Sequence, residues 1–222
     1  MSEIAPRPVR IALVDSGIDP GHPGCRGYAL QSGWHIDADG GAFAEPIPRD
    51  PLGHGTAVAT TLWSVCPRAV VVPLRVFDAA GRSSVRALVA ALRQIAMTDV
   101  AVVNCSLGFD DDFGASRQAQ SLLKDAAKFL LDRGVRIVVP AALPCGRANA
   151  LAAIGGLELV VADGNVPAAQ PRLQSVGAGS FWFASPFPPA GVPGLPPSHV
   201  HGSSLAVART SGMLANALSL RP

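Results

Sequence analysis

The sequence predicts an α/β fold of three layers, in which a mostly parallel central sheet carries helices on both faces. Short apolar segments alternate with longer segments of helical period, which is the pattern of parallel strands joined by crossover helices. Apolar residues make up 49% of the 222 residues and charged residues only 15%, as expected for a sheet buried on both faces. The chain is long enough to bury one full core, so we expect a single domain over residues 1–222.

The first half of the chain contains three predicted strands and two predicted helices. Residues 9–14 form a buried strand, residues 54–65 a helix and residues 69–76 the next strand. A helix over residues 84–97 and a strand over residues 100–106 follow. Ligands of open α/β sheets bind beyond the carboxyl ends of parallel strands, so residues just after these strands are well placed for chemistry.

The second half of the chain begins regularly and then loses its alternation. A helix over residues 115–133 ends at Gly134, and residues 135–141 form the next strand. The remaining elements are short strands over residues 157–162 and 180–184, an extended proline-rich loop over 185–198 and a closing helix over 202–218.

Charge and apolar patterning argue against several functional classes. The net charge of +2 comes without a cluster of lysine and arginine near aromatic residues, so nothing favours nucleic acid as a partner. Residues 1–8 lack an apolar signal segment, and no later segment has the roughly 18 uninterrupted apolar residues of a membrane span. We therefore expect a cytoplasmic protein without a membrane partner.

Four cysteines are scattered along the chain, at positions 25, 66, 105 and 145. None belongs to a Cys-x-x-Cys motif or to a Cys/His pair with metal-ligand spacing. A disulfide would form only if two of them meet in space. We expect free, mostly buried thiols, and the sequence predicts neither a metal site nor a cofactor.

Three residues at the ends of elements predict nucleophilic catalysis. Asp15 follows the first strand in an Asp-Ser-Gly turn, His54 opens a helix as His-Gly-Thr, and Ser204 opens the last helix within Gly-Ser-Ser-Leu-Ala. Taken singly they can be explained as a turn, a helix N-terminus and a helix cap. A serine hydroxyl becomes a good nucleophile when an imidazole takes its proton and a carboxylate orients that imidazole, and these residues supply all three groups. The helix start at Ser204 also turns its backbone amide toward a developing oxyanion.

The segments around these residues resemble the subtilisin-like serine peptidases, the subtilases. The chain order Asp, His, Ser is that of subtilisin and differs from the orders of chymotrypsin and the α/β-hydrolases. Residues 9–19 resemble the family's first-strand signature, residues 50–59 its histidine segment and residues 102–108 the strand that pairs with substrate. The similarity runs from about Val9 to the C-terminus and is weaker between residues 146 and 201. It implies a subtilisin-like fold and hydrolysis of peptide bonds.

The resemblance also implies a substrate-binding segment at Ser106, Leu107 and Gly108. An extended peptide would add to it through main-chain hydrogen bonds, whereas the alternative is that Gly108 only ends a strand. The acidic run at residues 110–112 is interpreted as a solvated loop, with a calcium site or a preference for basic substrate residues as alternatives. His22, His35, His199 and His201 are assigned no catalytic role.

The chain departs from the family at the asparagine that completes the oxyanion hole. Without a gap that position falls on Leu143, and with a shift of one residue on Pro144, and neither side chain donates a hydrogen bond. Asn149 reaches the position only if the loop is rebuilt. The Ser204 amide is therefore the one oxyanion donor that the sequence identifies. Loss of one such donor costs subtilisin about 10² to 10³ in turnover, so the oxyanion hole is expected to be weak.

Two further departures concern the ends of the domain. Ala208 stands where the family usually has a proline. Residues 1–8 are expected to be a short N-terminal extension without a propeptide. We expect a peptidase that processes a specific peptide or precursor. The alternative is a pseudoprotease that keeps the groove and binds extended peptides as a scaffold.

Overall fold

The computed structural model describes residues 7–109, 116–143, 146–190 and 202–220. Its helices are α1 (His54–Val65), α2 (Val85–Ile95), α3 (Arg117–Asp132) and α4 (Ser203–Ser219), with 3-10 turns η1 (Pro23–Cys25) and η2 (Ala150–Ala153). Its strands are β1 (Arg10–Asp15), β2 (Ala29–Leu30), β3 (Gly33–Ile36), β4 (Ala42–Glu45), β5 (Val70–Arg75), β6 (Val102–Cys105), β7 (Arg136–Pro140), β8 (Glu158–Ala162), β9 (Arg172–Val176) and β10 (Gly179–Ala184).

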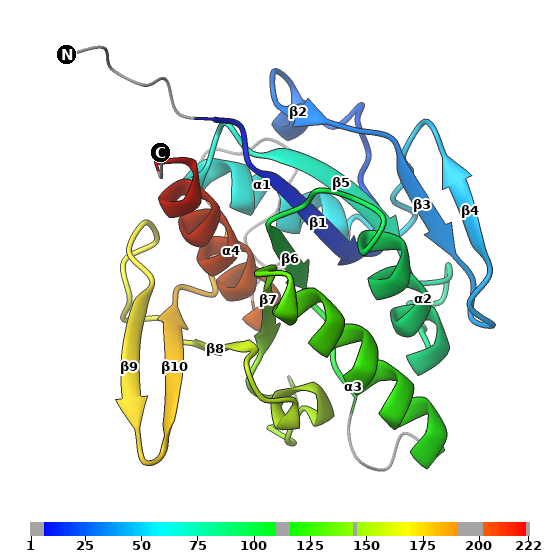
Figure 1. Ribbon diagram of the computed structural model, residues 1–222. Coiled ribbons are helices and arrows are strands. Elements are labelled where there is room, and N and C mark those ends of the chain that lie inside the picture. Colours follow the sequence, from blue (N-terminus) through cyan, green and yellow to red (C-terminus); the bar gives the residue numbers. More distant parts are fainter. Residues whose placement is uncertain (1–6, 110–115, 144–145, 191–201, 221–222) are drawn as a thin grey trace.

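The strands form one ten-stranded sheet with β1 near its centre (Figure 1). The order is β4-β3-β5-β1-β6-β7-β8-β10-β9, and β2 pairs with β5. Among the strands of the described ranges, the pairs β3/β4 and β9/β10 are antiparallel and the other pairs are parallel. The mostly parallel α/β fold predicted from the sequence is confirmed.

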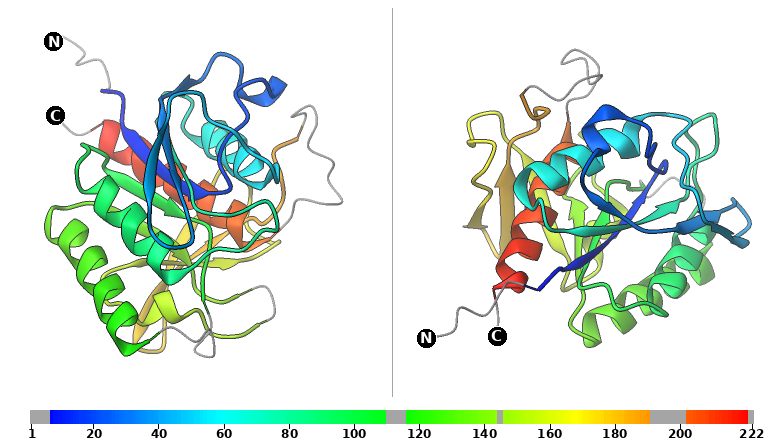
Figure 2. Two further views of the ribbon diagram at one scale, coloured as in Figure 1. Left: turned by 90° about the vertical axis from the view of Figure 1, so that its right-hand side faces the viewer. Right: turned by 90° about the horizontal axis from the view of Figure 1, so that it is seen from above.

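Helices cover both faces of the sheet, which makes three layers (Figure 2). Alternate residues of β1 show how the sheet divides the core: Ala12 and Val14 join the cluster under α2 and α3, whereas Ile11 and Leu13 join the cluster under α1 and α4. All four side chains are fully buried. A strand buried on both faces reads as a continuous apolar run, which is why β1 could be recognised from the sequence.

The helices begin and end where polar and glycine signals stand in the sequence. Ser84 accepts a hydrogen bond from the amide of Ala87 (3.0 Å) at the start of α2, and Ser116 caps α3 in the same way. Gly134 follows α3 with φ 81°, the left-handed conformation that glycine adopts without strain. Within the described ranges, no helix combines the length and apolar character needed to cross a membrane.

Strands β2, β3, β4 and β9 are absent from the sequence prediction. β4 and β9 are short, largely exposed and antiparallel at the two edges of the sheet, so they lack the apolar run of the central strands. Of the proline-rich segment 185–198, the structure describes residues up to 190. The closing helix, expected over residues 202–218, is shifted by one residue at each end.

Candidate active site

The structure brings Asp15 and His54 together at the carboxyl end of the central strand. Asp15 is the last residue of β1 and fully buried, and His54 is the first residue of α1. The imidazole Nδ1 lies 2.6 Å from Asp15 Oδ1, and the Ser16 amide donates to the same oxygen at 2.7 Å. The carboxylate therefore fixes both the tautomer and the orientation of the ring. The His54 side chain is 40% exposed, which leaves room for a substrate to approach it.

Electrostatics favour the protonated form of His54. The Asp15 carboxylate raises the pKa of His54 above its ordinary value, and the charge of Asp50 adds to this effect while burial opposes it. An imidazole in this setting accepts a proton more readily than it would in water. This is the property that a general base needs as it takes a proton from a hydroxyl.

The turn after β1 packs closely on the first turn of α1, and glycines make this possible. A Cβ on Gly55 would lie 2.0 Å from the carbonyl oxygen of Gly17, and Gly17 itself has φ 106°. The Gly55 amide donates to Ser16 Oγ at 2.9 Å. The sequence Asp-Ser-Gly and the sequence His-Gly-Thr are thus two halves of one contact, which sets the position of His54 relative to Asp15.

Asp50 is a residue of this site that the sequence analysis did not single out. It lies four residues before His54 and joins the loop ahead of α1 to the turn that follows β1. The one sequence feature that could have pointed to Asp50 is its position as an acidic residue in the histidine segment at residues 50–59. An aspartate ahead of a helix is also an ordinary capping residue, so the signal alone does not distinguish the two roles.

Ser204 is the second residue of α4, a helix that packs against α1. No side chain caps this helix, and within the described ranges no acceptor engages the Ser204 amide. Its carbonyl oxygen accepts a hydrogen bond from Ser106 Oγ at 3.4 Å, which links the helix start to the end of β6. Among the described contacts, no hydrogen bond joins Ser204 to His54. The structure therefore shows the contact between Asp15 and His54 and places Ser204 on the neighbouring helix α4. The hydrogen bond between Ser204 and His54 that would complete a triad is not among the described contacts.

Ser106, Leu107 and Gly108 follow β6 beside this helix start. The Asn104 side-chain amide donates to Ser106 Oγ at 2.8 Å, and Ser211 of α4 donates to Asn104 Oδ1 at 3.0 Å. Leu107 and Gly108 line a pocket of ≈ 450 Å³ together with Phe77, Gly81, Arg82, Ser83, Phe109 and Leu143. The predicted substrate segment thus borders an open pocket.

Asn149 is buried behind Gly108 and hydrogen-bonded to the loop around it. Its Nδ2 donates to the carbonyl of Pro140 at 2.8 Å, and its Oδ1 accepts from the amides of Leu151 (3.1 Å) and Phe109 (3.3 Å). A Cβ on Gly108 would lie 2.5 Å from the Asn149 side chain. These contacts explain both residues structurally, and a catalytic role of Asn149 stays a prediction.

Leu143 lies close to the start of α4. It lines a pocket of ≈ 410 Å³ together with Ala141, Ala142, Val160, Val161, Ala162, Gly202 and Ser203. The last two residues directly precede Ser204, so a hydrocarbon side chain borders the region where the resemblance expects an amide. Pro144, the acidic run at residues 110–112, His199 and His201 lie outside the described residues.

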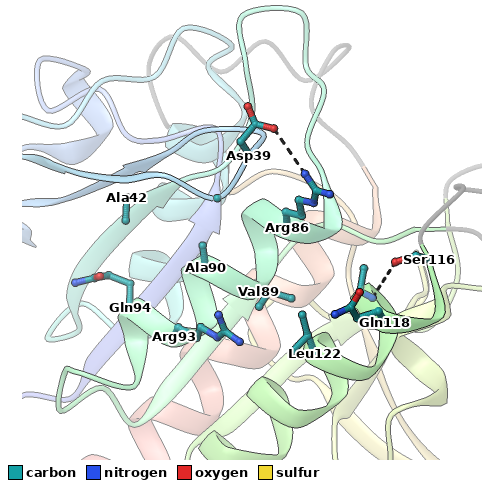
Figure 3. A pocket seen from close by; sticks show the side chains of 12 residues that line it. Asp39, Ala42, Arg86, Val89, Ala90, Arg93, Gln94, Ser116, Gln118 and Leu122 are labelled. Atoms are coloured by element: carbon teal, nitrogen blue, oxygen red, sulfur yellow. Dashed lines mark hydrogen bonds and ion pairs between the residues drawn. The ribbon is translucent and has the colours of Figure 1, made fainter.

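A larger groove lies away from these residues, between α2, the start of α3 and the β3–β4 turn (Figure 3). Its volume is ≈ 540 Å³, and Arg86 and Arg93 of α2 point along it. Arg86 lies 3.9 Å from Asp39 across the opening. None of the predicted site residues lines this groove, so it is not the candidate active site.

The cysteines offer no alternative nucleophile in the described part of the chain. Cys25, Cys66 and Cys105 are buried, as predicted, and none of the three forms a disulfide in the structure. Burial raises the pKa of the Cys25 thiol to about 11 and that of the Cys105 thiol to about 12. These thiols stay protonated near neutral pH, and a thiol is a much weaker nucleophile than a thiolate.

Comparison with known proteins agrees with this geometry. The model of the subtilase family (peptidase S8) matches residues 7–180. A subtilisin-like protease of Coccidioides posadasii (strain C735) is 31% identical over 111 residues, which cover 45% of this chain and 26% of that protein. The match thus spans about a quarter of the length of that relative.

Solved structures share the fold over nearly the whole chain. A lanthipeptide protease superposes with a TM-score of 0.69 at 17% identity, covering 96% of this chain and 73% of its own. Sphericase gives a TM-score of 0.67 at 20% identity, with 95% and 77% covered. The prenylagaramide maturation protease PagA gives 0.65 at 18% identity, with 97% and 77% covered. At these identities the likeness is one of fold.

Proposed function

The chain belongs to the subtilase family of serine peptidases, and on this basis we propose that it is an endopeptidase that uses Asp15, His54 and Ser204 as its catalytic triad. The observation that carries the proposal is the 2.6 Å contact between Asp15 and His54, made at the end of the central strand and beside α4, whose second residue is Ser204. This is the pair that a serine hydrolase needs in order to activate its nucleophile.

In the proposed reaction, Ser204 Oγ attacks the carbonyl carbon of the scissile peptide bond. His54 Nε2 takes the hydroxyl proton while its Nδ1–H remains bonded to Asp15. The imidazolium then gives that proton to the leaving amine, and the C–N bond breaks. Water, deprotonated by the same imidazole, hydrolyses the acyl-enzyme and restores Ser204.

The oxyanion of the tetrahedral intermediate would lie at the start of α4. The uncapped helix end offers the Ser204 amide, and the helix dipole favours negative charge there. We propose that this amide is the first donor. The oxyanion hole then lacks a second donor or receives it from another group, because Leu143 brings only hydrocarbon to the neighbouring pocket.

The substrate is proposed to be an extended peptide, in particular a specific precursor. Leu107 and Gly108 line an open pocket, and an extended chain would pair with the backbone of Ser106, Leu107 and Gly108. Two proteins of similar fold are, by their names, a lanthipeptide protease and a maturation protease, which supports a peptide precursor as the substrate class.

A second candidate function is peptide binding without turnover. Leu143 beside the nucleophile helix favours it, since a weakened oxyanion hole lowers the rate of acylation while leaving the groove intact. The intact pair of Asp15 and His54 favours the peptidase.

The two functions are distinguished by incubating the protein with a mixture of defined peptides and following cleavage by mass spectrometry. The peptidase yields internal cleavage products that are absent with Ser204→Ala. The scaffold instead retains peptides in a pull-down with both proteins and yields no products with either, which would overturn the peptidase.

A further inference from the structure

The carboxylate of Asp50 accepts five hydrogen bonds from the two segments that carry Asp15 and His54. Oδ1 accepts from Ser16 Oγ (2.7 Å) and from the amides of Gly53 (2.9 Å) and Leu52 (3.2 Å). Oδ2 accepts from the amide of Thr56 (2.8 Å) and from its hydroxyl (2.6 Å). In every contact a carboxylate oxygen of Asp50 is the acceptor, so this one side chain bonds to both segments.

These bonds replace the missing cap of the helix that carries His54. The N-cap residue Gly53 has no side chain to offer, and the first amides of any α-helix need partners from outside the helix. Asp50 Oδ2 takes the Thr56 amide, and Ser16 Oγ takes the Gly55 amide at 2.9 Å. A negative charge at this helix end is also favoured by the helix dipole. The first turn of α1 is thus held by Asp50 and by a residue next to Asp15.

Ser16 completes a chain of contacts between the two catalytic side chains. Its amide donates to Asp15, its hydroxyl accepts from Gly55 of α1, and the same hydroxyl donates to Asp50. A shift of either segment would break bonds on both sides of Ser16. Catalysis is sensitive to such shifts, because a misplacement of about 1 Å can cost roughly 10²-fold in rate.

We propose that Asp50 is a positioning residue that holds His54 against Asp15 by tying the first turn of α1 to the turn after β1. The inference rests on the proposed function for its kinetic consequence, whereas the contacts themselves do not depend on it. Ser16 is the link through which Asp50 acts, and Thr56 is the anchor on the helix.

Asp50 also acts on His54 through its charge. Two carboxylates, those of Asp15 and Asp50, raise the pKa of His54, and Asp15 has the larger effect. Removal of the Asp50 charge must therefore lower the pKa of His54. Because the neutral imidazole is the base, the acid limb of the activity profile should move to lower pH. A residue that only stabilised the fold would leave this limb in place.

The test compares Asp50→Asn with Ser16→Ala in the full chain. For Asp50→Asn we expect a fall in kcat of about 10- to 100-fold, little change in KM, and an acid limb at lower pH. For Ser16→Ala we expect a fall in kcat with a smaller move of the acid limb, because both carboxylates remain and only the position of His54 against Asp15 is loosened. The midpoint of the His54 titration, followed by NMR and assigned with His54→Ala, should fall in both variants and further in Asp50→Asn.

Asp37→Asn is the matched control, since Asp37 also accepts backbone amides, from Asp39 (3.0 Å) and Gly41 (2.7 Å), and contacts no triad residue. It should leave kcat and the His54 midpoint unchanged. A folded Asp50→Asn protein with the parent kcat and midpoint overturns the proposal, as does a loss of kcat that only follows a loss of thermal stability at an unchanged midpoint. If the parent chain itself cleaves no peptide, the proposed function fails, and the NMR midpoints alone then decide the role of Asp50.

Discussion

The buried carboxylate of Asp15 does two things to the His54 imidazole at the residue scale. It fixes the ring through the 2.6 Å contact at Nδ1, and it raises the pKa of His54. Both effects act on the free imidazole nitrogen, which must be deprotonated if it is to accept the Ser204 proton as proposed. Activity should therefore rise with pH through the titration range of His54.

Asp15→Asn should separate these effects from folding. We expect kcat/KM on the pH plateau to fall by roughly 10⁴-fold, as in the equivalent change of the serine protease triad. The acid limb should move to lower pH, because the charge that raises the pKa of His54 is gone. Kinetics over a pH series check this, with circular dichroism to show that the variant is folded. Full activity of His54→Ala would contradict the assignment of the base.

Leu143→Asn should raise the turnover of amide substrates. The new side chain would carry an N–H donor into the pocket beside the start of α4, and a restored oxyanion donor is expected to gain up to roughly 10²-fold in kcat. Ester substrates, with their better leaving group, should be cleaved far more readily than amides by the parent chain. Steady-state kinetics on matched ester and amide substrates make the measurement.

Asn149→Ala is the comparison for the oxyanion hole. It should weaken the fold, because the buried groups that bond to Asn149 lose their partner, and it should change kcat much less than a lost oxyanion donor would. If the folded variant instead loses about 10²-fold in kcat, Asn149 supplies the donor and the hypothesis of an incomplete oxyanion hole is wrong.

These residues differ in how far the sequence could reveal them. Asp15, His54 and Ser204 stand at the ends of predicted elements within short motifs, so their types and places were readable. Asp50 was not, since its role depends on Ser16, which is 34 residues away in sequence and is brought near only by the fold. The partners of Asn149 likewise come from separate segments.

At the scale of elements, the position of α1 against the turn after β1 decides where His54 lies. Gly55→Ala tests this contact, because an added Cβ would lie 2.0 Å from the backbone carbonyl of Gly17. Alanine inside a helix is ordinarily better than glycine by about 1 kcal/mol. Here the clash with backbone reverses the sign, and we expect a loss of roughly 1 to 3 kcal/mol in the free energy of unfolding together with a fall in kcat.

Gly155→Ala serves as the control, since a Cβ there meets no atom within 4 Å. Its unfolding free energy and kcat should stay near the parent values. Equal stability of the Gly55→Ala and Gly155→Ala proteins in urea unfolding would show that the contact between the two turns is looser than the structure has it.

The central elements could be predicted because burial shapes their sequences. The continuous apolar run of β1 is a local signal, and the structure has this strand where it was expected. The serine caps of α2 and α3 are local signals too, although the sequence analysis did not use them. The edge strands β4 and β9 carry no such signal, since their residues are mostly exposed. Their pairing is set by the neighbouring strands β3 and β10.

On the scale of the whole molecule, the three-layer arrangement brings the carboxyl end of β1 and the first turns of α1 and α4 to one region. Parallel strands direct their carboxyl ends to one edge of a sheet, and helices on the same face begin near it. The sequence could predict this convergence from the alternation of strands and helices. It could not predict the last few ångströms between Ser204 and His54, which depend on side-chain packing.

The most direct test of the account is to treat the folded protein with a fluorophosphonate probe and to map the modified residue by mass spectrometry. Only a serine activated by a neighbouring base reacts readily with such a probe at neutral pH. We predict a label on Ser204 that forms more slowly in His54→Ala and is absent in Ser204→Ala. A folded protein that stays unlabelled at high probe concentration, or that carries the label on the adjacent Ser203, would contradict the proposed triad.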